Sequence, residues 1–251
     1  MRNNTRIFKI ACICACWLIA FGSFVDATYA FGNVKEEGKE RETFLTKEER
    51  AFLEYKKIED EKMLEEQMPA IREEIKEFEK ENSYTTYGVI HGGFQYLDGD
   101  ILITNKRIST YHIGHAGIVV GDRVLGITPK ANNGHPRSLS MNSWFSVYPS
   151  DMVIRQKNRG RAPVSAAWYG KTFYLEGAGR DNTYSVASSL YDSNKDYCSS
   201  LVWKCYHNAG LDYKVQKPET LHWFVPSFIT PYDYIAHRVG NGFSAVHSVN
   251  W

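Results

Sequence analysis

Hydrophobic and polar positions divide the chain into three stretches with different periodicities. Residues 10–25 form an almost unbroken apolar run behind a charged N-terminus. Residues 45–82 are rich in Glu and Lys, and a stripe of apolar residues recurs there at spacings of three and four, which predicts one packed face of a helix. This stripe consists of Leu64, Met68, Ile71, Ile75 and Phe78. The remainder alternates short apolar runs with turn residues, a pattern typical of strands.

The charged stretch has its own start and break signals. Thr46 followed by Glu49 is typical of a capping box that begins a helix. Pro69 lies near the middle of the stretch and is expected to kink or restart the helix. We therefore expect an amphipathic helical hairpin packed on the rest of the protein. The alternative is a spacer or an arm that binds a partner.

Strands are expected in the third stretch at 101–104, 115–120 and 123–128, with weaker candidates at 152–156 and 171–176. Gly121-Asp122 suits a two-residue hairpin turn that begins with glycine. If Val120 faces Arg123 across this turn, then His115 faces Thr128.

A helix is expected over residues 196–208. Asp196 would be its N-cap and Gly210 its C-terminal stop. Cys198, Leu201, Val202 and Cys205 would share one face of this helix.

The N-terminus resembles a secretory signal peptide. Arg2, Arg6 and Lys9 precede the apolar run, and small residues follow at Ala27 and Ala30. The run is shorter than the roughly 20 residues that span a bilayer, so cleavage after Ala27 or Ala30 is favoured over a permanent anchor. We expect a secreted protein associated with the cell wall. Its segments would be a signal peptide (1–30), a charged helical arm (31–84) and a catalytic domain (85–251).

Charge is distributed unevenly although the formal net charge is only +1. Residues 45–82 contain 13 acidic and 8 basic residues, and residues 83–251 contain 11 acidic and 16 basic residues. A near-neutral chain gives no reason to expect nucleic-acid binding. The positive domain would attract an acidic polymer or headgroup, with peripheral association to a wall or membrane surface, and the acidic arm would modulate access.

Two cysteines, Cys198 and Cys205, would remain after cleavage of the signal peptide. Seven positions along one helix separate their Cα atoms by about 10 Å, too far for a disulfide. An unpaired cysteine in an oxidising compartment is a candidate reactive group. Cys205 is expected to be a small core residue.

Cys198 has the surroundings that a nucleophile needs. Near the start of a helix, unpaired N–H groups and the helix dipole favour its thiolate, and its own N–H could donate to an oxyanion. His115 would act as the base, and Thr128 on the next strand could accept from the imidazole as the third, orienting residue. His112 and His115 point to opposite faces of a strand, so a shared metal site is not expected. No metal or cofactor is needed.

These motifs occur in a recognisable order. The sequences Gly99-Asp100-Ile101, His115-Ala116-Gly117-Ile118-Val119 and Tyr197-Cys198-Ser199-Ser200-Leu201-Val202-Trp203 resemble the circularly permuted branch of the NlpC superfamily of papain-like cysteine peptidases, the YiiX- and YaeF-like proteins. His115 precedes Cys198, which is the permuted order. The resemblance covers about residues 87–236.

This resemblance implies an α+β, papain-like fold in which an antiparallel sheet packs on the cysteine helix. It implies Cys198 as nucleophile, His115 as base and a polar third residue, matched here by Thr128. Related sequences often carry Glu after the Cys-Ser pair and in the third strand. Here these positions fall at Ser200 and within Gly126-Ile127-Thr128.

The expected function is a cysteine peptidase or amidase that cleaves peptidoglycan stem peptides, with Tyr184 and Tyr197 as substrate-binding residues of the cleft. One alternative is a lipid-directed amidase, thioesterase or acyltransferase acting on an acyl lipid, because the permuted group also resembles lecithin:retinol acyltransferase. Such an enzyme would need a long apolar groove, for which Phe224, Val225, Phe228 and Ile229 are candidates. Another alternative is a non-catalytic wall-binding module, in which Cys198 would have ordinary reactivity.

Overall fold

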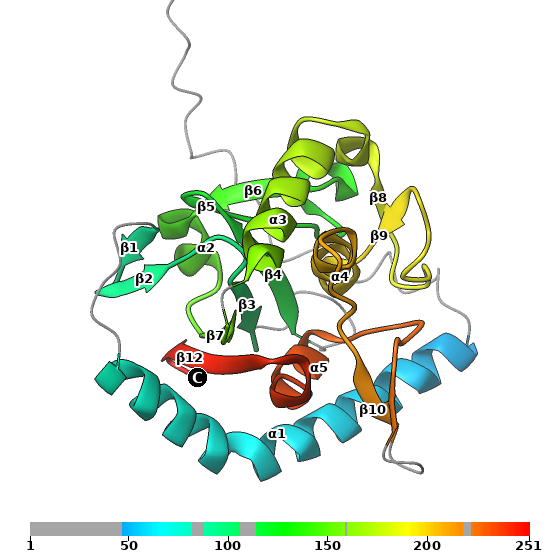
Figure 1. The fold of residues 1–251 in the computed structure, drawn as a ribbon. Coiled ribbons are helices and arrows are strands. Elements are labelled where there is room, and N and C mark those ends of the chain that lie inside the picture. Colours follow the sequence, from blue (N-terminus) through cyan, green and yellow to red (C-terminus); the bar gives the residue numbers. More distant parts are fainter. Residues whose placement is uncertain (1–46, 82–87, 106–113, 159, 218–221) are drawn as a thin grey trace, which may run out of the picture. The chain divides into compact units, whose positions relative to one another are not determined.

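A six-stranded, entirely antiparallel sheet forms the centre of the protein, in the order β12-β7-β3-β4-β5-β6 (Figure 1). The computed structural model describes residues 47–81, 88–105, 114–158, 160–217 and 222–251. The strands are β3 (Ile101–Thr104), β4 (His115–Val120), β5 (Arg123–Gly126), β6 (Arg137–Ser140), β7 (Asp151–Gln156) and β12 (Phe243–Val249).

Helices and small sheets surround this sheet. The helices are α1 (Lys47–Glu81), α2 (Met141–Val147), α3 (Arg161–Tyr169), α4 (Cys198–Asn208) and α5 (Pro231–Ala236), and a π-helical turn (Gly170–Leu175) follows α3. The two-stranded sheets are β1 (Val89–His91) with β2 (Phe94–Tyr96), β8 (Thr183–Tyr184) with β9 (Lys195–Asp196), and β10 (Val215–Lys217) with β11 (His222–Phe224). Short 3-10 turns lie at Ala131–Gly134, Ala178–Asp181 and Val239–Asn241. The architecture is α+β, as the sequence predicted.

Both faces of the central strand β4 are buried. Ala116 and Ile118 belong to the core shared with α3, α4 and α5, whereas Val119 belongs to the core shared with α2. Because side chains alternate along a strand, His115 belongs to the α2 face. A continuous apolar run at 116–120 is the sequence pattern of a strand buried on both sides.

The predicted hairpin is confirmed. Gly121 adopts a φ of 62°, which glycine tolerates without strain, and Val120 pairs with Arg123 in the predicted register. β5 ends at Gly126, two residues before the predicted end.

One weaker strand prediction was wrong. Residues 171–176 lie almost entirely in the π-helical turn after α3. Its two aromatic residues pack as they do on a helix. Tyr174 is buried, and Phe173 stacks on Tyr169 one turn earlier with ring centroids 5.0 Å apart. Aromatic enrichment therefore reflected helical packing rather than a strand.

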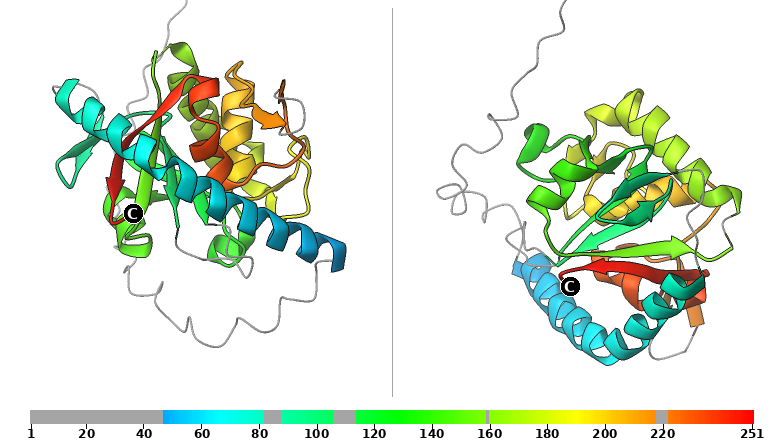
Figure 2. Two further views of the ribbon diagram at one scale, coloured as in Figure 1. Left: turned by 90° about the horizontal axis from the view of Figure 1, so that it is seen from below. Right: turned by 90° about the vertical axis from the view of Figure 1, so that its left-hand side faces the viewer.

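The charged stretch forms one continuous helix, so the expected hairpin was wrong. α1 passes through Pro69 and curves along β12 and α5 (Figures 1 and 2). Pro69 lies on the exposed side, where a curved helix tolerates a missing backbone hydrogen bond. The predicted stripe is confirmed as a packed face: Ile71 is fully buried, and Leu64, Met68, Ile75 and Phe78 pack against the two cores.

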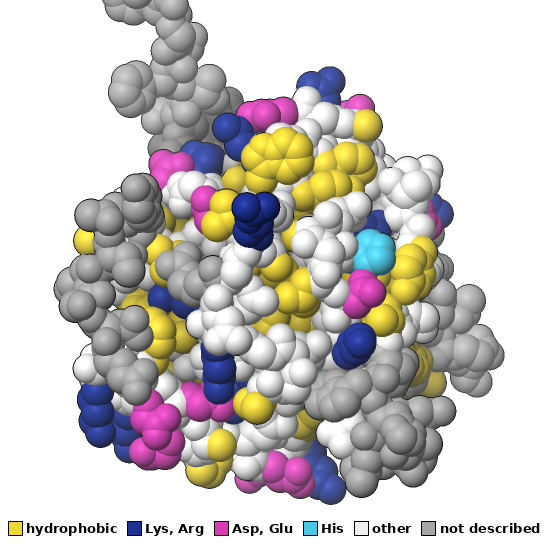
Figure 3. Space-filling view, in the orientation of Figure 1, with side chains coloured by type: hydrophobic (Ala, Val, Ile, Leu, Met, Phe, Trp, Pro, Cys, Tyr) yellow, Lys and Arg dark blue, Asp and Glu magenta, His cyan; other side chains and the backbone are white. Residues whose placement is uncertain are grey.

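Buried polar contacts anchor α1. Arg238, which is 1% exposed, donates to both carboxylate oxygens of Glu74 at 2.7 and 3.0 Å and to Gln67 at 2.7 Å. The backbone N–H of Ala245 in β12 also donates to Glu74 at 3.0 Å. α1 and the sheet thus belong to one compact unit. The outer side of α1 carries charges of both signs along the lower edge of Figure 3.

Several N-terminal predictions lie outside the described residues: the signal peptide, its cleavage at Ala27 or Ala30, and Thr46 of the capping box. The described helices include none with the length and apolar character needed to cross a bilayer.

Candidate functional site

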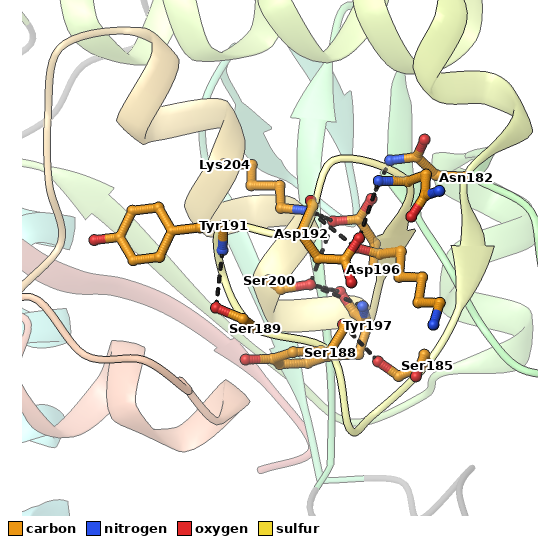
Figure 4. Close-up of polar contacts among 12 residues, drawn as sticks. Asn182, Ser185, Ser188, Ser189, Tyr191, Asp192, Asp196, Tyr197, Ser200 and Lys204 are labelled. Atoms are coloured by element: carbon orange, nitrogen blue, oxygen red, sulfur yellow. Dashed lines mark hydrogen bonds and ion pairs between the residues drawn. The ribbon is translucent and has the colours of Figure 1, made fainter.

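A buried polar network holds the chain that leads into α4 (Figure 4). Asp196 is fully buried, and its carboxylate accepts from Asn182 at 2.6 Å and from Tyr174 at 3.2 Å. Its ion pair with Lys204, one turn inside the helix, measures 2.8 Å. These contacts fix the start of α4 from both sides.

The helix begins later than the sequence predicted. Tyr197 is its N-cap and donates its backbone N–H to Ser200 Oγ at 2.8 Å, and Ser200 Oγ in turn donates to the Tyr197 carbonyl at 2.9 Å. Asp196 is therefore not the N-cap, because its carboxylate is engaged by Lys204 and it belongs to β9. Cys198 is the first helical residue, not the second or third. The helix ends as predicted, with Gly210 in the left-handed conformation at a φ of 82°.

Cys198 presents its sulfur to the start of β4. Backbone N–H groups of Ala116, Ser199 and Cys198 itself favour the thiolate, as does the Ser199 hydroxyl 3.9 Å from Sγ. Burial has the larger effect and raises the pKa of the thiol above its usual value. The sequence predicted a lowered thiol pKa, so this expectation was wrong for the resting structure.

His115 directly precedes Ala116, whose backbone N–H lies near the sulfur. His115 is 4% exposed. Its imidazole stacks on Trp144 and lies tilted against Tyr148, with centroid distances of 5.5 and 5.1 Å. Burial lowers the pKa of His115 to about 3, and the positive charge of Arg137 acts in the same direction. The imidazole is therefore neutral at pH 7 and able to accept a proton.

Cys198 and His115 both lie near the start of β4. The sulfur comes from α4 and lies near the Ala116 N–H, whereas the imidazole lies on the α2 face of the sheet. Tyr148 is near both residues, because its ring lies against that of His115 and the charge of a Cys198 thiolate would raise the pKa of Tyr148. Among the described residues, no hydrogen bond yet joins Sγ to the imidazole. Such bonds are often long in a resting site and shorten when substrate binds.

Thr128 follows β5 in the predicted register but is hydrogen-bonded elsewhere. Its hydroxyl accepts from the backbone N–H of Ala131 at 3.3 Å, and no hydrogen bond joins it to His115 in the described part of the chain. One lone pair and the hydroxyl proton remain for another partner. Its role as the orienting residue stays a prediction.

The two predicted substrate-binding tyrosines lie in different surroundings. Tyr197 is 1% exposed, accepts from the Ile229 N–H at 3.1 Å and stacks on Phe228 at 4.9 Å. This places Tyr197 in the core beneath the cysteine helix and not on an accessible wall. Tyr184 is half-buried beside Gly134 and keeps its place as a candidate.

The candidate apolar groove is partly filled by the protein itself. Ile229 is fully buried, and Phe228 packs edge-on against Phe52 of α1 with ring centroids 5.6 Å apart. The side chain of Phe224 lies outside the described residues.

Sequence reasoning missed Trp144, Tyr148 and Arg137, which surround the imidazole. Their signal was local and weak: Ser140 caps a seven-residue helix, accepting from the Ser143 N–H at 3.2 Å, and that helix carries Trp144. Short aromatic helices of this kind have no pattern that separates a site from ordinary core. The expectation that His112 and His115 do not share a metal site stays untested, because His112 lies outside the described residues. The described residues contain no cluster of His, Cys, Asp and Glu that could hold a metal.

Comparison with known proteins finds one relevant similarity. An uncharacterized 30.3 kDa protein from Bacillus thuringiensis is 32% identical over 153 residues, which make up 57% of this chain. The chain spans about half the length of that protein, 54%. No family model matches the chain, and no solved structure matches it.

Proposed function

We propose that this protein is a cysteine peptidase or amidase of the papain-like, circularly permuted type, acting on amide bonds of peptidoglycan stem peptides. One observation carries the proposal: the first residue of a buried helix, Cys198, directs its sulfur to the Ala116 N–H, next to His115. A strand that begins with the base and a helix that begins with the nucleophile, in that chain order, match the permuted arrangement.

The resting pair is a neutral thiol and a neutral imidazole. As Sγ attacks the substrate carbonyl, His115 takes the thiol proton and passes it to the leaving amine, and a thioester to Cys198 forms. His115 then deprotonates a water that hydrolyses the thioester and returns the proton to sulfur. The N–H groups at the start of α4 support an oxyanion role, because they have no partner within the helix.

The test is to trap the thioester. Full-length protein is incubated with purified stem peptides or with phosphatidylcholine vesicles, and Cys198 is examined by mass spectrometry for an acyl adduct. We expect stem-peptide cleavage and a Cys198 adduct in wild type and in Cys205→Ala, and neither in Cys198→Ala or His115→Ala. Cys205 is an internal reference, because it is a second free, buried cysteine on the same helix.

Two outcomes would overturn the proposal. Cleavage that persists in Cys198→Ala would remove the cysteine mechanism. An adduct formed only from the vesicles would support the lipid-directed enzyme instead of the peptidase.

A further inference from the structure

Arg137 is a cation near the candidate base, and none of the described carboxylates forms an ion pair with it. In β6 it pairs with Gly126 of β5, and directly paired residues project to the same face of an antiparallel sheet. In the described part of the chain, no carboxylate forms an ion pair with Arg137 and no acceptor lies within hydrogen-bond distance of its guanidinium. Arg137 is only half-buried, so a ligand can reach it.

Gly126 leaves space between this cation and the imidazole. A Cβ added at Gly126 would lie 3.4 Å from His115 Nε2, an ordinary contact distance, and 3.8 Å from Cε1. A side-chain atom at this position would also lie 3.6 Å from the Ala116 carbonyl oxygen, so the space above the buried Gly126 accepts an atom at contact distance from Nε2. Arg137 borders this position on the next strand.

The electrostatics of the position favour an anion. Burial lowers the pKa of His115 and raises that of Tyr148, and the charge of Arg137 adds to the first effect and opposes the second. The nearest carboxyl on the same row of the sheet, Asp151, is separated from His115 by Thr104 of β3 and accepts from Trp144 instead. An anion at Gly126 would neutralise Arg137 and favour a protonated His115.

We propose that Gly126 and Arg137 form a carboxylate-binding subsite, in which a free carboxylate of the substrate lies over Gly126 between the guanidinium and His115 Nε2. The substrate thus supplies the anion that orients the imidazole and stabilises its protonated form during the reaction. This inference rests on the proposed function and specifies its substrate class, peptides with a free carboxylate close to the scissile bond.

The experiment compares two alkylating reagents of almost equal size, iodoacetate and iodoacetamide, which differ in one carboxylate. The rate of Cys198 alkylation in the full-length protein is measured by mass spectrometry for each reagent. We expect the ratio of the iodoacetate rate to the iodoacetamide rate to fall about tenfold in Arg137→Met, the scale of one lost charge-assisted hydrogen bond. Arg123→Met is the matched control, because it removes the same charge from the neighbouring strand on the opposite sheet face, and its ratio should equal that of wild type.

A second variant tests the subsite without removing Arg137. Gly126→Asp places a carboxylate in the proposed position, where the backbone accepts a side chain, whereas Gly126→Asn adds the same volume without charge. We expect Gly126→Asp to increase the rate at which iodoacetamide alkylates Cys198 and to lower the ratio of the iodoacetate rate to the iodoacetamide rate. Gly126→Asn should change neither quantity.

An unchanged reagent ratio in both Arg137→Met and Gly126→Asp would overturn the subsite. Failure of the proposed function is recognised separately, by an iodoacetamide rate that is the same in wild type and His115→Ala, because that rate does not depend on a carboxylate site.

Discussion

The indole N–H of Trp144 donates to the carboxyl of Asp151 at 3.1 Å, and the same indole ring stacks on His115. Asp151 therefore holds the indole that packs on the imidazole of His115. Its second oxygen is buried without a hydrogen-bond partner among the described residues.

Asp151 should make the protein less stable at alkaline pH. Burial raises its pKa to about 8, whereas an unfolded Asp titrates near 3.8. Because the folded-state pKa is the higher one, the stabilisation is complete below about pH 4 and is lost as the pH rises through 8. Asp151→Asn keeps an acceptor for Trp144 and cannot ionise, so the difference in melting temperature between the variant and wild type should shift in favour of the variant between pH 5 and pH 8.5. Melting curves at both pH values measure this, and an equal difference at both would contradict it.

Glu74 should contribute more to stability than its neighbour on the same helix. Removing its carboxylate in Glu74→Ala leaves the buried Arg238 guanidinium and the Ala245 N–H without this partner. Breaking a buried pair on one side costs about 3–5 kcal/mol. Glu73 forms an exposed ion pair with Lys76 at 2.7 Å, and Glu73→Ala should have little effect on stability, because water screens this pair. Urea unfolding of the two variants compares them, and equal midpoints would show that Glu74 does not anchor α1.

Lys56 separates two buried carboxylates where α1 meets α5. Its Nζ lies 3.4 Å from Asp60 and 3.6 Å from Asp233. Burial and the charge of Asp233 raise the pKa of Asp60 to about 7, while Lys56 opposes them. His237 also faces Asp233, at 3.8 Å.

Lys56→Met should therefore destabilise the protein more at pH 8 than at pH 5. At pH 5 Asp60 is protonated and its repulsion from Asp233 is absent, whereas at pH 8 ionisation of Asp60 is opposed by burial and by Asp233 without the compensating charge of Lys56. Lys57→Met, the adjacent residue, is the control for charge and helix propensity. Free energies of unfolding at both pH values test the difference, and a loss that is independent of pH would exclude this role.

Local chemistry explains which features could be predicted. The Gly121-Asp122 turn determines the register of β4 and β5, and the apolar stripe of α1 determines its packed face, because each depends on residues close in sequence. The single helix through Pro69 could not be predicted, since it depends on Glu74 and Arg238, which are 164 residues apart.

In the candidate site, too, some features depend on residues close in sequence and others on residues far apart in sequence. The positions of Cys198 and His115 follow from one helix start and one strand start. Their pKa directions depend on burial by segments that are distant in sequence, and the cation next to the base comes from β6. A sequence shows which groups can ionise, but only packing shows how much water each has lost.

The pH profile of Cys198 should distinguish a neutral resting pair from a preformed ion pair. Because burial raises the pKa of Cys198 and lowers that of His115, the thiolate is scarce at neutral pH, and its alkylation by iodoacetamide should keep rising above pH 9. His115→Ala should slow the reaction at pH 7, since the neutral imidazole accepts the thiol proton there, and should have little effect at pH 10. Cys205→Ala ensures that the signal comes from Cys198. A rate that reaches a plateau below pH 7 would show instead that thiolate and imidazolium already form in the resting protein.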